Sequence, residues 1–293
     1  NLLLAVYLSA KCPVFIAPAM DLDMFAHPSN QKNIETLTSF GNKVLPVGEG
    51  ALASGLEGKG RMLEPNEIAD YLITFFNPDL PLKGKRILIT TGPTYEAIDP
   101  VRFIGNHASG KMGFALAEVA ANKGAEVVLI SGPTTEKISH PSVTVQAVVS
   151  AKEMFQAVKK EFSQSDVAIA AAAVADFKPH SVASQKIKKD KSNLSLSLTP
   201  TEDILAYMGK NKKGHCLIGF ALETENELEN AKTKLKQKNL DGIVLNSLQD
   251  SGAGFSVSTN KITFIHANLS TKAFPLQSKL QCAHRIFEQI LSL

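Results

Sequence analysis

Along residues 86–293, short continuous apolar runs alternate with segments whose apolar residues recur at helical spacing. Continuous runs are typical of strands buried on both faces of a parallel sheet. They predict strands at residues 86–90, 126–131, 166–174, 215–222 and 241–246, and the spacing predicts helices at 112–124, 151–162 and 225–239. The alternation predicts an α/β fold, a doubly wound and mostly parallel Rossmann-like sheet with right-handed crossovers. A hairpin over residues 260–275 and a closing helix over 278–291 should follow.

The pattern breaks at residues 77–85, where two prolines and a glycine follow a helix-like segment. We therefore place a first unit at residues 1–77, a linker at 78–85 and a second unit at 86–293. The N-terminal segment predicts a helix that runs into a buried strand, "PVFIAPAM". It has neither an initiator Met nor a basic leader, so we expect the chain to begin inside a domain.

Composition and charge narrow the kinds of partner. A net charge of +3 on 293 residues is too weak a bias to indicate nucleic-acid binding, whereas a small anionic ligand fits it. No apolar run reaches the roughly 18 residues of a membrane span, so no membrane partner is expected. The three cysteines lie far apart without a C-x-x-C pair, which indicates neither a disulfide framework nor a zinc site. We expect a reduced, cytoplasmic setting.

The segment from Gly105 to Met112, "GNHASGKM", has the spacing of a nucleotide phosphate-binding loop except at its last residue. Such loops read G-x-x-x-x-G-K-[ST], and their Ser or Thr hydroxyl binds Mg²⁺. Met112 stands there instead, and the predicted strand ends well before Gly105. A dinucleotide fingerprint is excluded as well, because no G-x-G-x-x-G follows the strand.

The same loop gathers polar and cationic residues in front of the predicted helix at 112–124. They are Asp99, Arg102, Asn106, His107, Ser109 and Lys111, with Gly92 in the turn after the strand and Gly110 next to Ser109. Helix N-termini attract anions, and open α/β sheets bind ligands at their carboxyl edge. We interpret the loop as an anion site; the alternative is an ordinary surface crossover with a Ser cap.

Later strand ends and one helix add residues of similar chemistry. They are Asp176, Lys186, Lys188, Lys189, Phe220, Glu223, Lys234 and Lys238. A lysine segment can close over phosphates, and lysines four apart share one helix face. The alternative is that these lysines are solvated surface, which is the commoner case for such runs.

Several stretches, in this order, resemble one known family: "TTGPTYEAIDPVRFIGNHASGKMGFALAE", "AAAVADFKP", "KIKK", "GFALET" and "KNLDGIVLN". They resemble the phosphopantothenate–cysteine ligases of coenzyme A biosynthesis. The resemblance implies that the carboxylate of 4′-phosphopantothenate attacks the α-phosphate of CTP, giving an acyl-cytidylate and pyrophosphate. The amine of cysteine then displaces CMP. Neither step needs a protein nucleophile, so the protein would position and neutralise two anions.

The resemblance also implies roles for individual residues. Asn106 would polarise the acyl-cytidylate carbonyl, Lys186 would lie on a flexible lid over the triphosphate, and Arg102 would meet an anionic part of a substrate. The remaining residues expected around CTP are Ala171, Ala172, Ala173, Asp176, Glu202, Asp203, Ile204, Leu205, Phe220, Lys234 and Lys238. A divalent cation, Mg²⁺, would shield the triphosphate, but its protein ligands are unknown.

The first unit resembles the end of a flavin-dependent decarboxylase to which such ligases are often fused. "APAMDLDMFAHPSNQKNIETL" and "GALASGLEGKGRMLEP" resemble its substrate-binding and flap motifs. Asp21 stands where that family has Asn, and Ser54 stands where it has a proton-donating Cys. A Ser hydroxyl is a far weaker acid than a thiol. We therefore expect FMN in the intact decarboxylase domain, but neither FMN binding nor decarboxylation by this fragment.

Three interpretations of the whole remain at this stage. The first is a ligase acting on CTP, 4′-phosphopantothenate and cysteine, as a homo-oligomer. The second is a bifunctional parent that also decarboxylates phosphopantothenoylcysteine. The third is a non-catalytic flavoprotein-like regulatory subunit, which would not need Asn106, "KIKK" and "GFALET" together.

Overall fold

The computed structural model describes residues 2–76, 80–189, 194–223, 225–247, 254 and 257–293. The chain divides into two compact units, Asn1–Asp79 and Leu80–Leu293. Each unit is described by itself. Among the described residues, no helix combines the length and the apolar character that crossing a bilayer requires.

Over its described residues, 2–76, the first unit contains short strands and four helices. Its elements are α1 (Leu2–Ser9), β1 (Phe15–Ile16), α2 (Leu22–Ala26), α3 (Pro28–Ser39), β2 (Lys43–Val44), β3 (Gly48–Ala51), β4 (Glu57–Arg61) and α4 (Pro65–Phe76). Strand β1 pairs in parallel with β2, and β3 pairs antiparallel with β4. The ring of Phe15 packs edge-on against Phe75 of α4, with 4.8 Å between centroids, so aromatic contacts attach β1 to the last helix.

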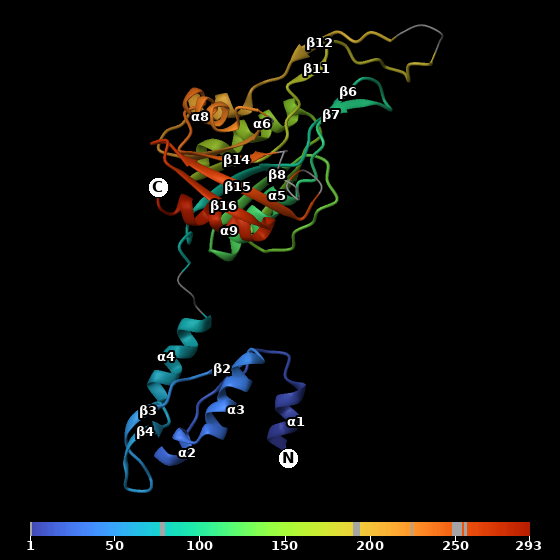
Figure 1. The fold of residues 1–293 in the computed structure, drawn as a ribbon. Helices are drawn as coiled ribbons and strands as arrows, with labels where there is room; N and C mark the ends of the chain where they lie inside the picture. The colour runs from blue at the N-terminus through green and yellow to red at the C-terminus, as the bar shows by residue number, and fades with distance from the viewer. Residues whose placement is uncertain (1, 77–79, 190–193, 224, 248–253, 255–256) are drawn as a thin grey trace. The chain divides into compact units, whose positions relative to one another are not determined.

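The second unit is built on one eight-stranded sheet (Figure 1). Its strands are β5 (Arg86–Thr91), β8 (Glu126–Ser131), β9 (Val143–Ala147), β10 (Val167–Ala170), β13 (Cys216–Glu223), β14 (Gly242–Ser247), β15 (Thr259–His266) and β16 (Thr271–Ser278). The order across the sheet is β16-β15-β14-β13-β10-β5-β8-β9. Neighbours from β14 to β9 are parallel, and β15 and β16 add an antiparallel edge. The predicted mostly parallel, doubly wound fold is confirmed.

Helices cover both faces of this sheet (Figure 1). One face carries α5 (Lys111–Asn122) and α9 (Lys279–Ile290), and the other carries α6 (Ala151–Glu161), α7 (Ile204–Lys210) and α8 (Glu227–Gln237), with a short 3-10 turn, η1 (Phe162–Gln164), after α6. Because side chains alternate along a strand, Ile87 and Ile89 join the α5–α9 core, whereas Leu88 joins the core under α6, α7 and α8. The continuous apolar runs in the sequence reflect this burial on both sides.

Two small hairpins lie outside the sheet, and the sequence pattern did not predict them. Strand β6 (Tyr95–Ala97) pairs with β7 (Phe103–Gly105), and β11 (Phe177–Pro179) pairs with β12 (Leu198–Pro200). Figure 1 shows both projecting from the same side of the sheet. The ring of Phe103 stacks on that of Tyr95, with 3.9 Å between centroids, yet Phe103 stays 51% exposed. Strands outside the core do not need a continuous apolar run, and these two strands are therefore hard to detect in the sequence.

Some predicted boundaries were wrong. The strand predicted at 166–174 ends at Ala170, although the apolar sequence continues. Beyond that residue the chain still donates from Ala171 N to Thr90 O and from Ala173 N to Gly92 O, but it no longer pairs with β13. Its small side chains are half-buried because they pack on the core from one side and line pockets on the other.

Candidate functional site

The sheet reverses its winding between β5 and β10. From β5 the chain moves outward to β8 and β9, then returns to β10 on the other side of β5. At such a switch point the loops after two neighbouring strands separate and leave a crevice at their carboxyl ends. Thr91 ends β5 and Ala170 ends β10, so the candidate residues that follow them meet at this crevice.

The loop from β5 to α5 encloses the β6–β7 hairpin, so it is not a nucleotide-binding turn of the G-x-x-x-x-G-K-[ST] type. Gly110 is the N-cap of α5, at φ 81° and without a side-chain acceptor, so the alternative of a Ser cap was wrong. Thr91 Oγ1 donates to Gly110 O at 2.9 Å. A Cβ on Gly113 would lie 2.2 Å from Thr91 Oγ1, so only glycine lets this helix start so close to β5.

A pocket of about 400 Å³, here called the α5 pocket, opens at the start of this helix. It brings together most of the residues predicted from the loop and from the end of β10. Those predicted residues are Gly92, Asn106, Ser109, Gly110, Lys111, Ala171, Ala172, Ala173, Asp176, Phe220 and Lys234. The lining residues that the sequence analysis did not single out include Asn246, Asn260 and Lys279.

A second pocket of about 730 Å³, here called the α8 pocket, opens between β12, α7 and α8. Its lining includes the predicted residues Ala172, Asp176, Glu202, Asp203, Ile204, Leu205, Phe220, Lys234 and Lys238. Ala172, Val174, Asp176, Phe220 and Lys234 line both pockets. The two pockets therefore adjoin along the end of β10, and molecules held in each would meet there.

The side-chain amide of Asn106 is attached to this shared wall. Its Nδ2 donates to Ala173 O at 3.2 Å and to Val174 O at 2.9 Å. Because both partners are carbonyl oxygens, which only accept, the amide must turn its NH₂ group toward them, and this fixes its orientation. A substrate oxygen that takes a hydrogen bond from Asn106 must therefore replace one of these carbonyls.

Lysines in the last turn and at the C-cap of α8 supply positive charge to the α8 pocket. Lys234 Nζ donates to Phe220 O at 2.9 Å, and burial lowers the pKa of Lys234 despite the nearby carboxylates of Glu223 and Asp176. Lys238 Nζ lies 2.6 Å from Asp203 Oδ2, and Asp203 also caps α7 by accepting from Ala206 N. Burial would raise the pKa of the Asp203 carboxyl, but these bonds outweigh it and hold that pKa below its usual value.

Lys279 is the cation that the sequence analysis missed. It is the first residue of α9 and is 7% exposed, and its Nζ donates to Gly254 O at 3.1 Å. Burial, and then the charge of Lys111, lowers its pKa. The available signal was its position, because a lysine in the first turn opposes the helix dipole and needs another reason to be there.

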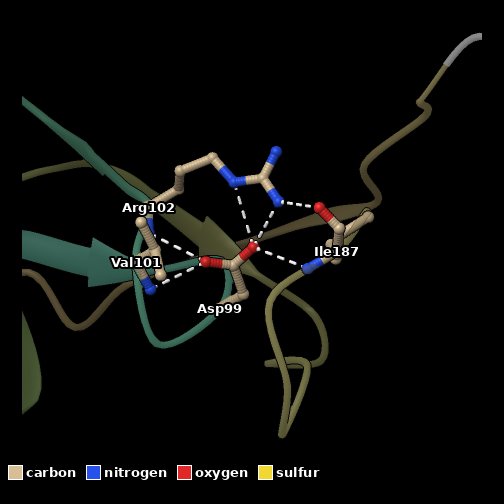
Figure 2. Close-up of polar contacts among 4 residues, drawn as sticks. All are labelled: Asp99, Val101, Arg102 and Ile187. Atoms are coloured by element: carbon tan, nitrogen blue, oxygen red, sulfur yellow. Dashed lines mark hydrogen bonds and ion pairs between the residues drawn. The ribbon is translucent and has the colours of Figure 1, made fainter. Parts of the chain in front are cut away.

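Arg102 and Lys186 are not brought into either pocket. Arg102 pairs with Asp99 at 2.5 Å and donates to Ile187 O (Figure 2). Lys186 is exposed in the chain segment before Ile187, and neither residue is among those lining the two pockets. The structure thus separates these two from the sixteen predicted residues that line one or both pockets.

No group of three or more His, Cys, Asp or Glu side chains within the described ranges could hold a metal ion. Asp176 contributes one carboxylate where the pockets adjoin. A single carboxylate suits a magnesium ion held mainly by substrate phosphates and water.

In the first unit, one decarboxylase-like position lies in the turn before α2 and the other in the β3–β4 turn. Asp21 caps α2 by accepting from Leu22 N at 2.6 Å, and Met20 N donates to Gly60 O at 2.9 Å. A Cβ on Gly60 would lie 2.3 Å from Met20 O, so β4 presses against this turn. Ser54 is exposed in the β3–β4 turn, where its Oγ accepts from Leu56 N at 3.4 Å.

Comparisons with known proteins match each of the two units to a protein family. Residues 82–293 match the family described as DNA/pantothenate metabolism flavoprotein C-terminal domain, and residues 1–77 match the family described as flavoprotein. The chain belongs to the DNA/pantothenate metabolism flavoprotein family. The resemblance carried by the sequence motifs is confirmed.

Relatives within this family share the whole length of the chain. A cysteine/cysteine sulfinic acid decarboxylase of an unknown prokaryotic organism is 52% identical, over 100% of this chain and 83% of its own. The coenzyme A biosynthesis bifunctional protein CoaBC of Bacillus subtilis (strain 168) is 42% identical, over 100% of this chain and 73% of its own. The crystal structure of a CoaBC C-terminal domain, 42% identical, matches with a TM-score of 0.62 over 73% of this chain and 97% of that one.

Proposed function

We propose that this protein joins 4′-phosphopantothenate to cysteine at the expense of CTP, through an acyl-cytidylate, in coenzyme A biosynthesis. The observation that carries the proposal is the pair of adjoining pockets, with Asn106 in the α5 pocket hydrogen-bonded to Val174, which lines both. Transfer of a nucleotidyl group to a carboxylate needs two adjoining sites. The carboxylate must attack the α-phosphate of the nucleotide from the side opposite the leaving pyrophosphate. The CoaBC relatives, at 42% identity in Bacillus subtilis, support the same pathway.

The charges of the two pockets suggest which substrate each holds. Lys234 and Lys238 lie in the α8 pocket, the larger of the two, which we assign to CTP. Lys111 and Lys279 line the α5 pocket at a helix N-terminus, which we assign to the phosphorylated acid. Asp176 lies where the pockets adjoin, and there it is available to Mg²⁺ carried by the triphosphate.

The reaction then balances without a protein nucleophile. A carboxylate oxygen of the acid bonds to the α-phosphorus of CTP, and the bond to pyrophosphate breaks. The cysteine nitrogen next bonds to the acyl carbon, CMP leaves with the electron pair, and the amine loses its proton. Asn106 stands beside this carbonyl position, and exchanging one backbone carbonyl for the substrate oxygen would bring its N–H to the developing charge.

Omitting each substrate in turn tests the proposal. Pyrophosphate release should require CTP and 4′-phosphopantothenate, and should occur only once per site without cysteine. With cysteine present, phosphopantothenoylcysteine and CMP should form in equal amounts. Release with the acid omitted, or turnover without CTP, would refute the assignment.

Lys279→Met is expected to weaken binding of the acid substrate selectively. A charge-assisted hydrogen bond contributes about 1.5–3 kcal/mol, which corresponds to roughly a 10- to 150-fold rise in the KM for 4′-phosphopantothenate. The KM for CTP should stay within about twofold, because the lysine lines only the α5 pocket of the two. Steady-state kinetics of this variant and of Lys152→Met, an exposed α6 position, provide the comparison. Equal rises in both KM values would contradict the assignment of the pockets.

Decarboxylation of a cysteine derivative is the second candidate, favoured by the 52% identical relative and by the match of residues 1–77 to the flavoprotein family. The flavoprotein match suggests FMN as the cofactor of a decarboxylase part. However, the close glycine contact in the first unit is made to its own backbone, at Met20, so it identifies no flavin cradle.

We expect the purified chain to bind no stoichiometric FMN, since the glycine contact at Met20 forms no cradle for it. We also expect it to release no carbon dioxide, since the Ser54 hydroxyl is a far weaker acid than the Cys thiol that the family has there. Visible absorbance near the flavin bands measures the first point. Labelled carbon dioxide from phosphopantothenoylcysteine, cysteine and cysteine sulfinic acid measures the second. Release from any of the three would establish the second candidate.

A homo-oligomer and a cytoplasmic location stay predictions. Apolar side chains left exposed on the two hairpins support self-association, at Val101, Phe103, Phe177 and Leu198. Free cysteines at Cys12, Cys216 and Cys282 are compatible with a reducing compartment.

A further inference from the structure

The carboxylate of Asp99 is the centre of a compact polar cluster at the β6–β7 turn. Its side chain is 0% exposed, and it accepts hydrogen bonds on both oxygens (Figure 2). Oδ1 accepts from Val101 N and Arg102 N, each at 2.8 Å. Oδ2 accepts from Arg102 Nε at 3.0 Å, Arg102 Nη2 at 2.5 Å and Ile187 N at 3.1 Å.

Ile187 is held on both sides of its backbone by this cluster. Its N–H donates to Asp99, and its carbonyl accepts from Arg102 Nη2 at 2.5 Å. A second attachment lies just upstream, where Ala183 N donates to Ile98 O at 3.0 Å. The two attachments bracket Lys186, so the backbone that carries this lysine is fixed against the β6–β7 hairpin.

We propose that Asp99 is a positioning residue for Lys186, acting through Arg102 and the backbone of Ile187; the proposal rests on the ligase function proposed above. Lys186 itself is exposed, and its long side chain has about 2 kcal/mol of rotamer entropy to lose on binding a phosphate. Fixing its backbone beforehand lowers the remaining cost of ordering. In this arrangement Arg102, whose charge is already paired with Asp99, links that carboxylate to the carbonyl of Ile187.

A structural role alone is the competing explanation, since β6 and β11 lie against each other and the cluster attaches their loops. The two explanations differ in one respect. A positioning residue loses its effect once Lys186 is gone, whereas a residue that only stabilises the fold keeps it. A double-mutant cycle separates these cases.

The experiment compares the rate of the pyrophosphate burst for Asp99→Asn, Lys186→Ala and the double variant of the full chain. Asp99→Asn keeps the size but loses the charge, and should slow the first step about 100-fold, as misplacement by about 1 Å does. The double variant should be no slower than Lys186→Ala. Asp166→Asn is the matched control, because Asp166 also accepts from a backbone N–H, that of Arg86, and pairs with a cation, Lys85. Its effect should multiply with that of Lys186→Ala.

Trypsin cleavage provides a readout that does not depend on activity. Asp99→Asn should expose residues 180–189 to faster cutting, while Asp166→Asn should not. If Asp99→Asn fails to fold, Arg102→Gln enters the same cycle, because it keeps the bonds from Asp99 to the backbone. The proposal would be overturned if the rate losses of Asp99→Asn and Lys186→Ala multiply in the double variant. It would also be overturned if trypsin cuts residues 180–189 of Asp99→Asn no faster than those of the unmodified chain. If the unmodified chain releases no pyrophosphate, the ligase function fails, and the cleavage rates still decide whether Asp99 holds the segment.

Discussion

Asn106→Asp is expected to release one pyrophosphate per site and then stop, with acyl-cytidylate accumulating in place of amide. The substitution preserves size but replaces the N–H₂ donor with a negatively charged acceptor. Removing one donor to a developing oxyanion costs about 10²- to 10³-fold in rate, so the loss should fall on the attack by the cysteine amine. The structure adds a second effect, because the new carboxylate faces the carbonyl oxygens of Ala173 and Val174, which repel it.

Quenched single turnovers analysed by mass spectrometry measure this outcome. Asn268→Asp is a suitable control, because that exposed side chain in the β15–β16 turn uses only its oxygen as an acceptor from Ser270. It should behave as the unmodified chain does. Loss of the pyrophosphate burst in Asn106→Asp, with no intermediate, would show that Asn106 acts in the first step instead.

Lys186→Ala should slow the first step and leave the fold intact. Losing one charged contact to a transition-state phosphate costs about 2–4 kcal/mol, or roughly 30- to 1,000-fold in rate. Because the side chain is exposed and its backbone is held through Ile187, truncation removes no buried contact. Rapid-quench measurement of the pyrophosphate burst, with thermal unfolding as a check on stability, would detect the loss.

Lys160→Ala is the control for this variant, since Lys160 is exposed in α6 and lines neither pocket. Its burst rate should stay within about threefold of the unmodified rate, as a solvated surface charge allows. If Lys186→Ala also keeps its rate, the lysine run is solvated surface and the role implied by the resemblance is wrong.

The central sheet was predictable because burial on both faces leaves little choice of residue. Strand β8 was predicted with its exact bounds, and β5 was one residue short, as Val127–Ile130 and Ile87–Ile89 are almost completely buried. Strand β9 was missed. Its residues alternate without a continuous apolar run, and most of them are exposed at the sheet edge.

The site was predictable only where its residues follow one another in the chain. The loop before α5 and the residues after β10 were found because each forms a short motif at a strand end. Lys279 escaped because it reaches Lys111 only through the packing of α9 on α5, which pairs segments far apart in the sequence. The contact of Arg102 with a substrate anion, which the resemblance implies, stays a prediction. Its pairing with Asp99 was not predicted, because it emerges from a tight turn.

The packing of α9 against α5 also has a consequence during synthesis on the ribosome. Every residue of the α8 pocket precedes residue 239, so the pocket that we propose for CTP can form once α8 has emerged. The α5 pocket waits for Asn260 and Lys279, which follow the β14 strand and belong to the C-terminal hairpin and helix. A nascent chain would thus acquire its two binding halves in sequence, and retention of the phosphorylated acid would report that the last helix has docked.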